Sequence, residues 1–225
     1  MYNQFMSCPF LNSVKDYYKD YYRRVNSSYV RILHASPDAP AVDIYVNNSP
    51  IALNFPYRGF TQYIPLQNGI YSIKIFPAGS RRNLIIDKNI NIPANTILTI
   101  AMVNELQNIA LYPIEDTSMN IQPGKVKLRF VHLSPNTPSV DVRLSNERSL
   151  FKDVEYKEVT NYITMNPNIY TVEIYKTNSN QRILYVPNVK LRSNKFYTIY
   201  AVGLFGKRPP LQVLIPLDGG TYLRF

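Results

Sequence analysis

Apolar and polar residues alternate with a period of two along much of the chain. This is the pattern of β-strands that bury one face, because successive side chains of a strand point to opposite sides. Val42, Ile44 and Val46 form one buried face, and the turn-forming cluster at 47–50 ends that segment. The pattern predicts strands at residues 29–34, 41–47, 60–66, 70–76, 83–87, 96–103 and 107–112, and again at 127–132, 139–145, 159–165, 169–175, 182–186, 196–203 and 211–217.

The first strand and the corner that follows it occur twice. Residues 30–46 read VRILHASPDAPAVDIYV and residues 128–144 read LRFVHLSPNTPSVDVRL, so both keep the frame His-x-Ser-Pro-x-x-Pro-x-Val-Asp. The match continues at an offset of 98 and then 99 residues. This spacing is too long for a solenoid repeat and suits two whole domains. The sequence therefore predicts a tandem duplication.

About seven short strands in roughly 95 residues, with no convincing helix between them, are typical of an immunoglobulin-like sandwich. We therefore predict an all-β chain of two tandem immunoglobulin-like antiparallel β-sandwiches with a short N-terminal arm. The predicted parts are the arm at 1–28, the first sandwich at 29–120, the second, basic sandwich at 121–217 and a tail at 218–225. Because the join at 117–123 is short, we expect the two sandwiches to be held end to end with limited freedom.

The N-terminal arm is rich in tyrosine, which suits contacts with a neighbouring molecule because its ring is apolar and its hydroxyl is polar. The apolar residues of the arm fall at the spacing of a short helix, and the Tyr-Tyr pairs also fit an extended segment. The single cysteine excludes an internal disulfide and could join two molecules. The candidate assembly residues are Cys8, Tyr17, Tyr18, Tyr21 and Tyr22.

The sequence predicts neither a signal peptide nor a membrane span. Its first ten residues lack the cationic start and the apolar core of a signal peptide. No apolar run approaches the roughly 18–20 residues that cross a bilayer. We expect a chain made in the cytoplasm without a secretion signal, or one that was cut before residue 1.

The repeated corner holds the only two histidines of the chain, each accompanied by a serine and an aspartate. Its prolines fix their own φ angles and keep the residues before them out of the helical region, so the corner is rigid. A hydrolase triad would also need a nucleophile elbow and an oxyanion hole, and a metal site would need further ligands. We therefore predict no catalytic residue, cofactor or metal. The expected structural corner, in which His and Asp bond backbone groups or each other, comprises His34, Ser36, Pro37, Pro40, Asp43, His132, Ser134, Pro135, Pro138 and Asp141.

The net charge of +10 is concentrated in the second half of the chain. Residues 29–120 have no net charge, whereas residues 121–217 carry an excess of +8. Such an excess suits an anionic polymer, a glycan or a partner protein, although a solvated basic face explains it as well. No specific nucleic-acid partner is expected, because no recognised nucleic-acid-binding signature is present. The candidate anion-binding residues near strand ends are Lys190, Arg192, Lys195, Lys207 and Arg208.

The first corner, HASPDAPAVD, and the later Gly-x-Tyr-x-Ile segment at 69–73 resemble the bacterial family known as domain of unknown function 4397. The resemblance covers residues 29–217 in two copies. The second copy departs from it at Leu133, Asn136, Thr137 and Asn168. The resemblance implies sandwich domains, often in tandem and usually on exported or surface proteins, with no assigned catalytic residues.

Two functions are consistent with these features. The missing secretion signal, the tyrosine-rich arm, the lone cysteine and the abundance of Asn, Ile, Lys and Tyr are similar to coat-layer proteins of spore-forming bacteria. We therefore predict a non-enzymatic structural protein of the spore coat or outer spore layer, which associates with itself or with other coat or surface proteins. The alternative is a cell-surface or extracellular module that binds a glycan, an anionic polymer or a partner protein through the basic second half.

Overall fold

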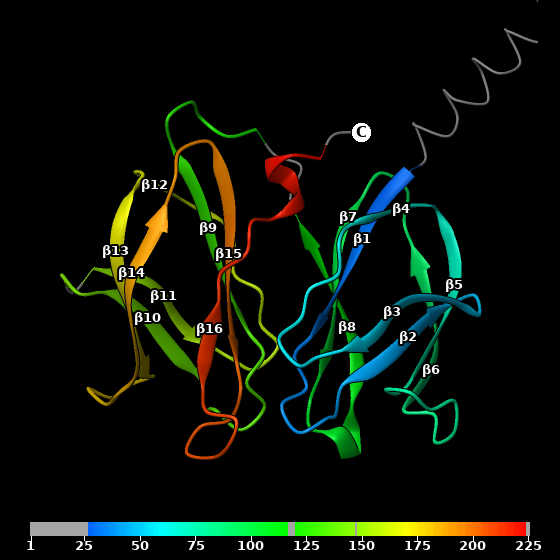
Figure 1. The fold of residues 1–225 in the computed structure, drawn as a ribbon. Coiled ribbons are helices and arrows are strands. Elements are labelled where there is room, and N and C mark those ends of the chain that lie inside the picture. Colours follow the sequence, from blue (N-terminus) through cyan, green and yellow to red (C-terminus); the bar gives the residue numbers. More distant parts are fainter. Residues whose placement is uncertain (1–26, 117–119, 147, 224–225) are drawn as a thin grey trace, which may run out of the picture.

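The computed structural model describes residues 27–116, 120–146 and 148–223, which form sixteen strands and two short 3₁₀ turns (Figure 1). The first half contains β1 (Ser27–His34), β2 (Val42–Val46), β3 (Ser49–Phe55), β4 (Ile64–Gln67), β5 (Gly69–Pro77), β6 (Ile86–Ile92), β7 (Ile97–Val103), η1 (Leu106–Asn108) and β8 (Ala110–Asp116). The second half contains β9 (Val126–His132), β10 (Val140–Leu144), β11 (Ser149–Val154), β12 (Ile163–Met165), β13 (Asn168–Lys176), β14 (Arg182–Leu191), β15 (Lys195–Val202), β16 (Gln212–Leu214) and η2 (Gly219–Thr221).

Each half is a sandwich of two four-stranded sheets with the same strand order in both halves. The central sheets are β4-β1-β7-β8 and β12-β9-β15-β16, and the outer sheets are β3-β2-β5-β6 and β11-β10-β13-β14. The strand pairs are antiparallel except β1 with β7 and β9 with β15, which run parallel. The predicted all-β fold of two tandem sandwiches is therefore confirmed, with one parallel pair added in each central sheet.

Two strands were missed by the alternation pattern, one in each half. β3 and β11 lie at the edges of the outer sheets, and most of their side chains are exposed or half-buried. A strand with so little buried surface shows no clear alternation, and Pro50 inside β3 reads as a turn residue although prolines are tolerated on edge strands. The structure also moves the predicted strand at 83–87 to β6 at Ile86–Ile92.

The two halves lie side by side, with their central sheets facing each other between the outer sheets (Figure 1). The expected end-to-end arrangement is therefore wrong. The reason is the second face of the central strands: every residue of β7 is buried, whereas a sheet with one wet face would alternate. A third apolar cluster, separate from the core of each sandwich, fills the space between the halves and contains Leu33, Ala35, Ala101, Val103, Ile114, Val131, Leu133, Tyr200 and Val202.

The predicted N-terminal arm and C-terminal tail have different outcomes. The proposed arm helix and the candidate assembly residues Cys8, Tyr17, Tyr18, Tyr21 and Tyr22 lie outside the described residues. The segment predicted as a tail is packed instead, since the Asp218 side chain has no exposed surface. No helix in the described part of the chain combines the length and hydropathy of a membrane span.

Candidate functional site

The repeated corner carries the chain from a central sheet to an outer sheet, and a buried histidine holds it. His34, at the end of β1, lies with its Nε2 atom 3.1 Å from the carbonyl oxygen of Pro40. In the second copy, Nε2 of His132 lies 3.2 Å from the carbonyl oxygen of Pro138. A carbonyl can only accept, so Nε2 carries the proton. Burial lowers the pKa of both imidazoles, which favours the neutral ring.

The serines of the two corners differ in their contacts. The Ser134 hydroxyl lies 2.6 Å from both the carbonyl oxygen of Gly203 and the hydroxyl of Thr137. The first corner has Ala39 at the position of Thr137, and Ser36 makes no side-chain hydrogen bond among the described residues. Both serines are fully buried, so neither hydroxyl is placed to meet a substrate from solvent. Of the corner prolines, Pro37 is buried, Pro135 and Pro138 are half-buried and Pro40 is exposed.

The corner aspartates bond to backbone rather than to the histidines. Asp43 accepts hydrogen bonds from the N–H groups of Asn54 at 2.8 Å and Gly79 at 2.9 Å. These contacts tie β2 to β3 and to the loop after β5. Asp43 alternates with the core residues Val42 and Ile44, and its side chain is nevertheless buried.

Replacing Asp43 by alanine should lower the free energy of unfolding by about 1–3 kcal/mol, because the N–H groups of Asn54 and Gly79 lose a charged acceptor. Urea melts of the full chain measure the loss. The Asp87→Ala variant is the control, since Asp87 is an exposed acid on β6. An Asp43→Ala variant as stable as this control would show that the corner does not need its carboxylate.

A hollow of about 770 Å³ opens on the outer sheet of the second half. Its floor comes from neighbouring positions of β10 and β13, where Asp141 pairs with Tyr175 and Arg143 pairs with Glu173. Its wall comes from β11 and from the hairpin loop after β13. The residues that line it are Asp141, Arg143, Leu144, Ser149, Lys152, Asp153, Glu173, Tyr175, Thr177, Asn178 and Asn180.

The floor of the hollow is a fixed polar network. The Arg143 guanidinium lies 4.6 Å above the centre of the Tyr175 ring and donates to Asp141 at 2.9 Å. The Tyr175 hydroxyl donates to Glu173 at 2.9 Å, and Arg182 donates to the same carboxylate at 2.6 Å. Although burial works in the opposite direction, the N–H of Asp153 and the charge of Arg143 lower the pKa of Asp141. The network therefore holds its charged groups in one arrangement at neutral pH.

The rim of the hollow is polar and unengaged. Lys152, Asn178 and Asn180 are exposed, and no hydrogen bond or ion pair within the described ranges involves their side chains. Sequence reasoning missed this site, apart from Asp141. The alternation pattern places Arg143, Glu173 and Tyr175 on the solvent side of their strands, and only the pairing of β10 with β13 brings them together.

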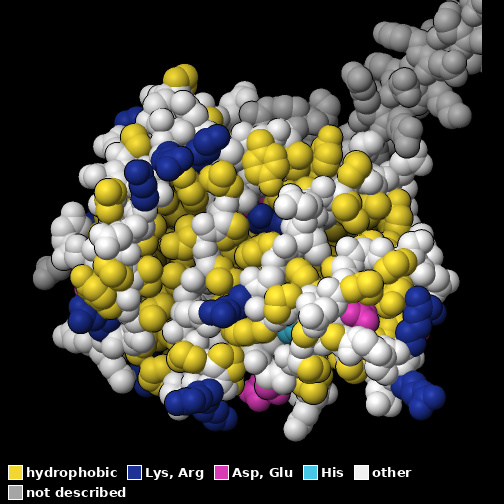
Figure 2. Space-filling model, in the orientation of Figure 1, with side chains coloured by type: hydrophobic (Ala, Val, Ile, Leu, Met, Phe, Trp, Pro, Cys, Tyr) yellow, Lys and Arg dark blue, Asp and Glu magenta, His cyan; other side chains and the backbone are white. Residues whose placement is uncertain are grey.

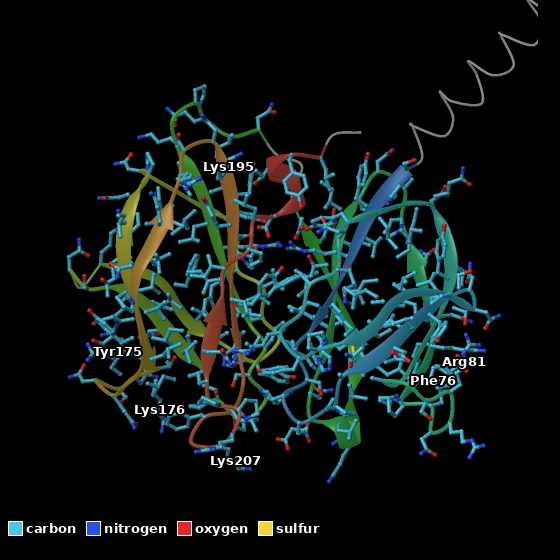
Figure 3. All side chains as sticks on the ribbon, in the orientation of Figure 1. Phe76, Arg81, Tyr175, Lys176, Lys195 and Lys207 are labelled. Carbon is cyan, nitrogen blue, oxygen red and sulfur yellow. The ribbon has the colours of Figure 1, made fainter. Side chains whose placement is uncertain are left out.

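The predicted basic site divides into two. Lys190, Arg192 and Lys195 lie near the turn that joins β14 to β15, at one end of the second sandwich. Lys207 and Arg208 lie in the loop after β15, and Figure 3 places Lys195 and Lys207 at opposite ends. Lys and Arg side chains are scattered over the visible face of this half rather than gathered in one patch (Figure 2). The five residues therefore do not form a single anion site.

Comparison with known proteins gives a family match and three distant structural likenesses. The family described as Domain of unknown function (DUF4397) matches residues 28–143 and 144–219. No curated protein matches significantly. The two family matches divide inside β10, whereas the strands group on either side of 117–125. The domain boundaries 29–120 and 121–217 therefore stay a proposal.

The solved structures are similar at low identity. They include a candidate cell adhesion protein of Bacteroides ovatus ATCC 8483, with 9% identity, a TM-score of 0.25 and coverage of 84% of this chain and 96% of that one. A leucine-rich repeat protein of Bacteroides thetaiotaomicron VPI-5482 has 13% identity and a TM-score of 0.21, over 80% of this chain and 26% of that one. The Bacillus anthracis TIE protein has 14% identity and a TM-score of 0.23, over 80% of this chain and 34% of that one. Likenesses this low carry no argument about function.

The family match and the fold agree with each other. The matched segments run without a break from 28 to 219, and each half of the structure repeats the same order of eight strands. This chain therefore belongs to the family Domain of unknown function (DUF4397), in two tandem copies.

Proposed function

We propose that this protein is a non-enzymatic surface module that binds a neutral glycan in the hollow on the outer sheet of its second half. The observation that carries the proposal is the hollow itself, with a fixed polar floor and an unengaged polar rim. The resemblance to a family of exported or surface proteins supports a place at the cell surface. The buried serines and histidines of the corners support a role without catalysis.

The chemistry of the lining favours a polyhydroxylated ligand over an anion. Sugar hydroxyls both donate and accept, so they suit a site that offers amides, carboxylates and cations together. The lining holds the acids Asp141, Asp153 and Glu173 against the bases Arg143 and Lys152, and therefore has no positive excess. An anionic polymer would meet three carboxylates there, which disfavours it.

The Tyr175 ring, together with the Arg143 guanidinium that lies over it, gives the site a flat surface against which a sugar ring can pack. Arg143 lies over the Tyr175 ring and the Tyr175 hydroxyl bonds to Glu173, so the ring is held in place before a ligand arrives. A surface that is already ordered loses less conformational entropy on binding. The exposed amides of Asn178 and Asn180 then supply hydrogen bonds that fix the orientation of the sugar.

A spore-coat function has less support than the binding function. Its support came from composition and from the tyrosine-rich arm, and residues 1–26 lie outside the described structure. The hollow provides a site that does not depend on that arm.

A glycan array followed by calorimetry on the full chain tests the proposal. Replacing Tyr175 by alanine should weaken binding of the selected glycan about tenfold, which corresponds to roughly 1.4 kcal/mol of lost ring contact. Phe76→Ala is the matched control, because Phe76 pairs with Asp43 as Tyr175 pairs with Asp141, on the opposite outer sheet (Figure 3). Failure of every neutral glycan to bind, or an equal loss in the Phe76→Ala variant, would refute the proposal.

A further inference from the structure

The interface between the halves is built from the same surface of each repeat. β1 pairs with β7 and β9 pairs with β15 in equivalent registers, so that Leu33 corresponds to Val131 and Val103 to Val202. All four side chains lie in the apolar cluster between the halves. The contact is therefore isologous in the way of a two-fold dimer, although both partners belong to one chain.

Reciprocal ion pairs cross this interface. Arg31 on β1 donates to Asp218 of the second half at 3.3 Å, and Arg129 on β9 donates to Asp116 of the first half at 2.6 Å. All four side chains are at most 5% exposed. Each guanidinium also donates to a backbone carbonyl of the opposite half, at 2.9 Å from Arg31 and 2.6 Å from Arg129. Each half thus satisfies a buried charge of the other.

Each charged group is also anchored within its own half. Arg31 Nε donates to Thr99 at 2.9 Å, and Arg129 Nε donates to Thr198 at 2.7 Å. The Tyr63 hydroxyl donates to Asp116, and the Tyr162 hydroxyl donates to Asp218. The arginines and aspartates therefore point across the interface from fixed positions, and the same set is present on both sides.

The apolar positions of the interface are not the same on both sides. Ala101, which pairs with Leu33, corresponds to Tyr200, which pairs with Val131. Tyr200 is fully buried, and its ring lies 5.8 Å from that of Phe60 in the first half. Burial, above all, raises the pKa of Tyr200 to about 12, and the charges of both aspartates and both arginines act on it as well. By its contacts, the Tyr200 ring lies in the apolar cluster between the halves, which also contains Ala101.

We infer that the central face of each half is a recognition surface for the other half of this chain and rejects a second copy of itself. Two second halves would bring two Tyr200 rings into the space that one Tyr200 ring and Ala101 share here. Two first halves would bring two Ala101 side chains into that space and leave the volume of the tyrosine ring unfilled, which forfeits dispersion contacts. The charge pairs would form in any of these combinations, so the sizes of the side chains decide which faces pair.

Exchanging the large and small residues in the full chain tests this directly. The Ala101→Tyr variant should melt about 4–8 °C lower, because overpacking a core of this kind costs roughly 2 kcal/mol. Adding Tyr200→Ala to that variant should recover part of the loss, although Tyr200→Ala alone is also destabilising. Tyr185→Ala, at an exposed tyrosine of the outer sheet, is the control and should leave the melting temperature unchanged. A fully tolerated Ala101→Tyr variant, or a double variant that melts lower than the sum of the singles predicts, would overturn the inference.

A pairing assay separates recognition from stability. A protease site is inserted after the exposed Asn120 of the full chain, which is prepared with two different N-terminal tags and then cleaved. After the two cleaved proteins are mixed in urea and diluted, capture of one tag should recover second halves and none of the first halves that carry the other tag. Recovery of the other tagged first half in the proportion of random pairing would overturn the inference.

Discussion

Replacing Asp116 by alanine is expected to lower the free energy of unfolding by about 3–5 kcal/mol, because it leaves a buried guanidinium without its carboxylate. Arg129 donates to Asp116 at 2.6 Å, and the two side chains are 3% and 0% exposed. The Tyr63 hydroxyl loses its acceptor in the same variant. For a chain of this length, a loss of that size lowers the melting temperature by roughly 6–20 °C.

Two further variants show whether the charge itself is responsible. Asp116→Asn keeps an oxygen that can accept from Arg129 and removes the negative charge, so its loss should fall between those of the wild type and Asp116→Ala. Asp87→Ala removes an exposed carboxylate and should change stability by no more than about 0.5 kcal/mol. Urea melts of the four proteins make the comparison. If Asp116→Ala were no less stable than Asp87→Ala, the buried ion pairs would have no part in holding the halves together.

The second large effect is expected on the pH dependence of stability, through Asp218. Burial, followed by the nearby charge of Asp116, raises the pKa of Asp218 to about 6. Arg31, Arg129 and Thr198 oppose this shift and do not cancel it. A carboxyl group whose pKa is higher in the folded chain than in the unfolded chain stabilises the fold below the unfolded pKa, near 3.8. That stability is lost as the pH rises through about 6.

Asn at position 218 removes this titration and isolates its contribution. The stability of the wild type relative to Asp218→Asn should be about 2–3 kcal/mol greater at pH 4 than at pH 7.5, since each pKa unit corresponds to about 1.4 kcal/mol. Urea melts of both proteins at several pH values measure this difference. A difference that is constant, or that grows toward neutral pH, would contradict the prediction.

In the wild type and in Asp218→Asn alike, the corner histidines change the stability with pH in the direction opposite to that of Asp218. Burial lowers the pKa of His34 and His132, so the unfolded chain takes up protons first as the pH falls below 6.5. Their contribution is therefore present above 6.5 and is lost in acid. Because Asp218→Asn leaves both histidines unchanged, the comparison between the two proteins cancels their effect. Asp218→Asn alone should consequently lose stability in acid more steeply than the wild type.

The sequence predicted the sandwich of each half because its signals are local. Alternation at residues such as Val42, Ile44 and Val46 identifies a strand with one buried face, whatever covers that face. The recurrence of the corner motif identified the duplication. The rigidity of the corner was also predictable, because its prolines and turn residues set the backbone without distant contacts. The same reasoning missed β3 and β11, since edge strands with little buried surface show no clear alternation.

The hollow on the outer sheet of the second half shows one limit of such local signals. Arg143 and Tyr175 are outward residues on strands about thirty positions apart, and nothing in their spacing relates them. Their contact depends on the register between β10 and β13, which long-range strand pairing sets. Charge composition pointed instead to Lys195 and Lys207, which the fold separates.

By itself, the amino-acid sequence determined that this protein is a tandem pair of all-β sandwiches, each with a rigid, proline-rich corner after its first strand. Only the tertiary structure decided that the sandwiches lie side by side around a buried ionic centre. Arg31 and Thr99 alternate with core residues and therefore read as a solvent face, while Asp218 lies in a segment that reads as a tail. Their burial depends on a second sheet that approaches from far along the chain. An alternation with a period of two shows that one face of a strand is covered, and it carries no information about what lies against the other face.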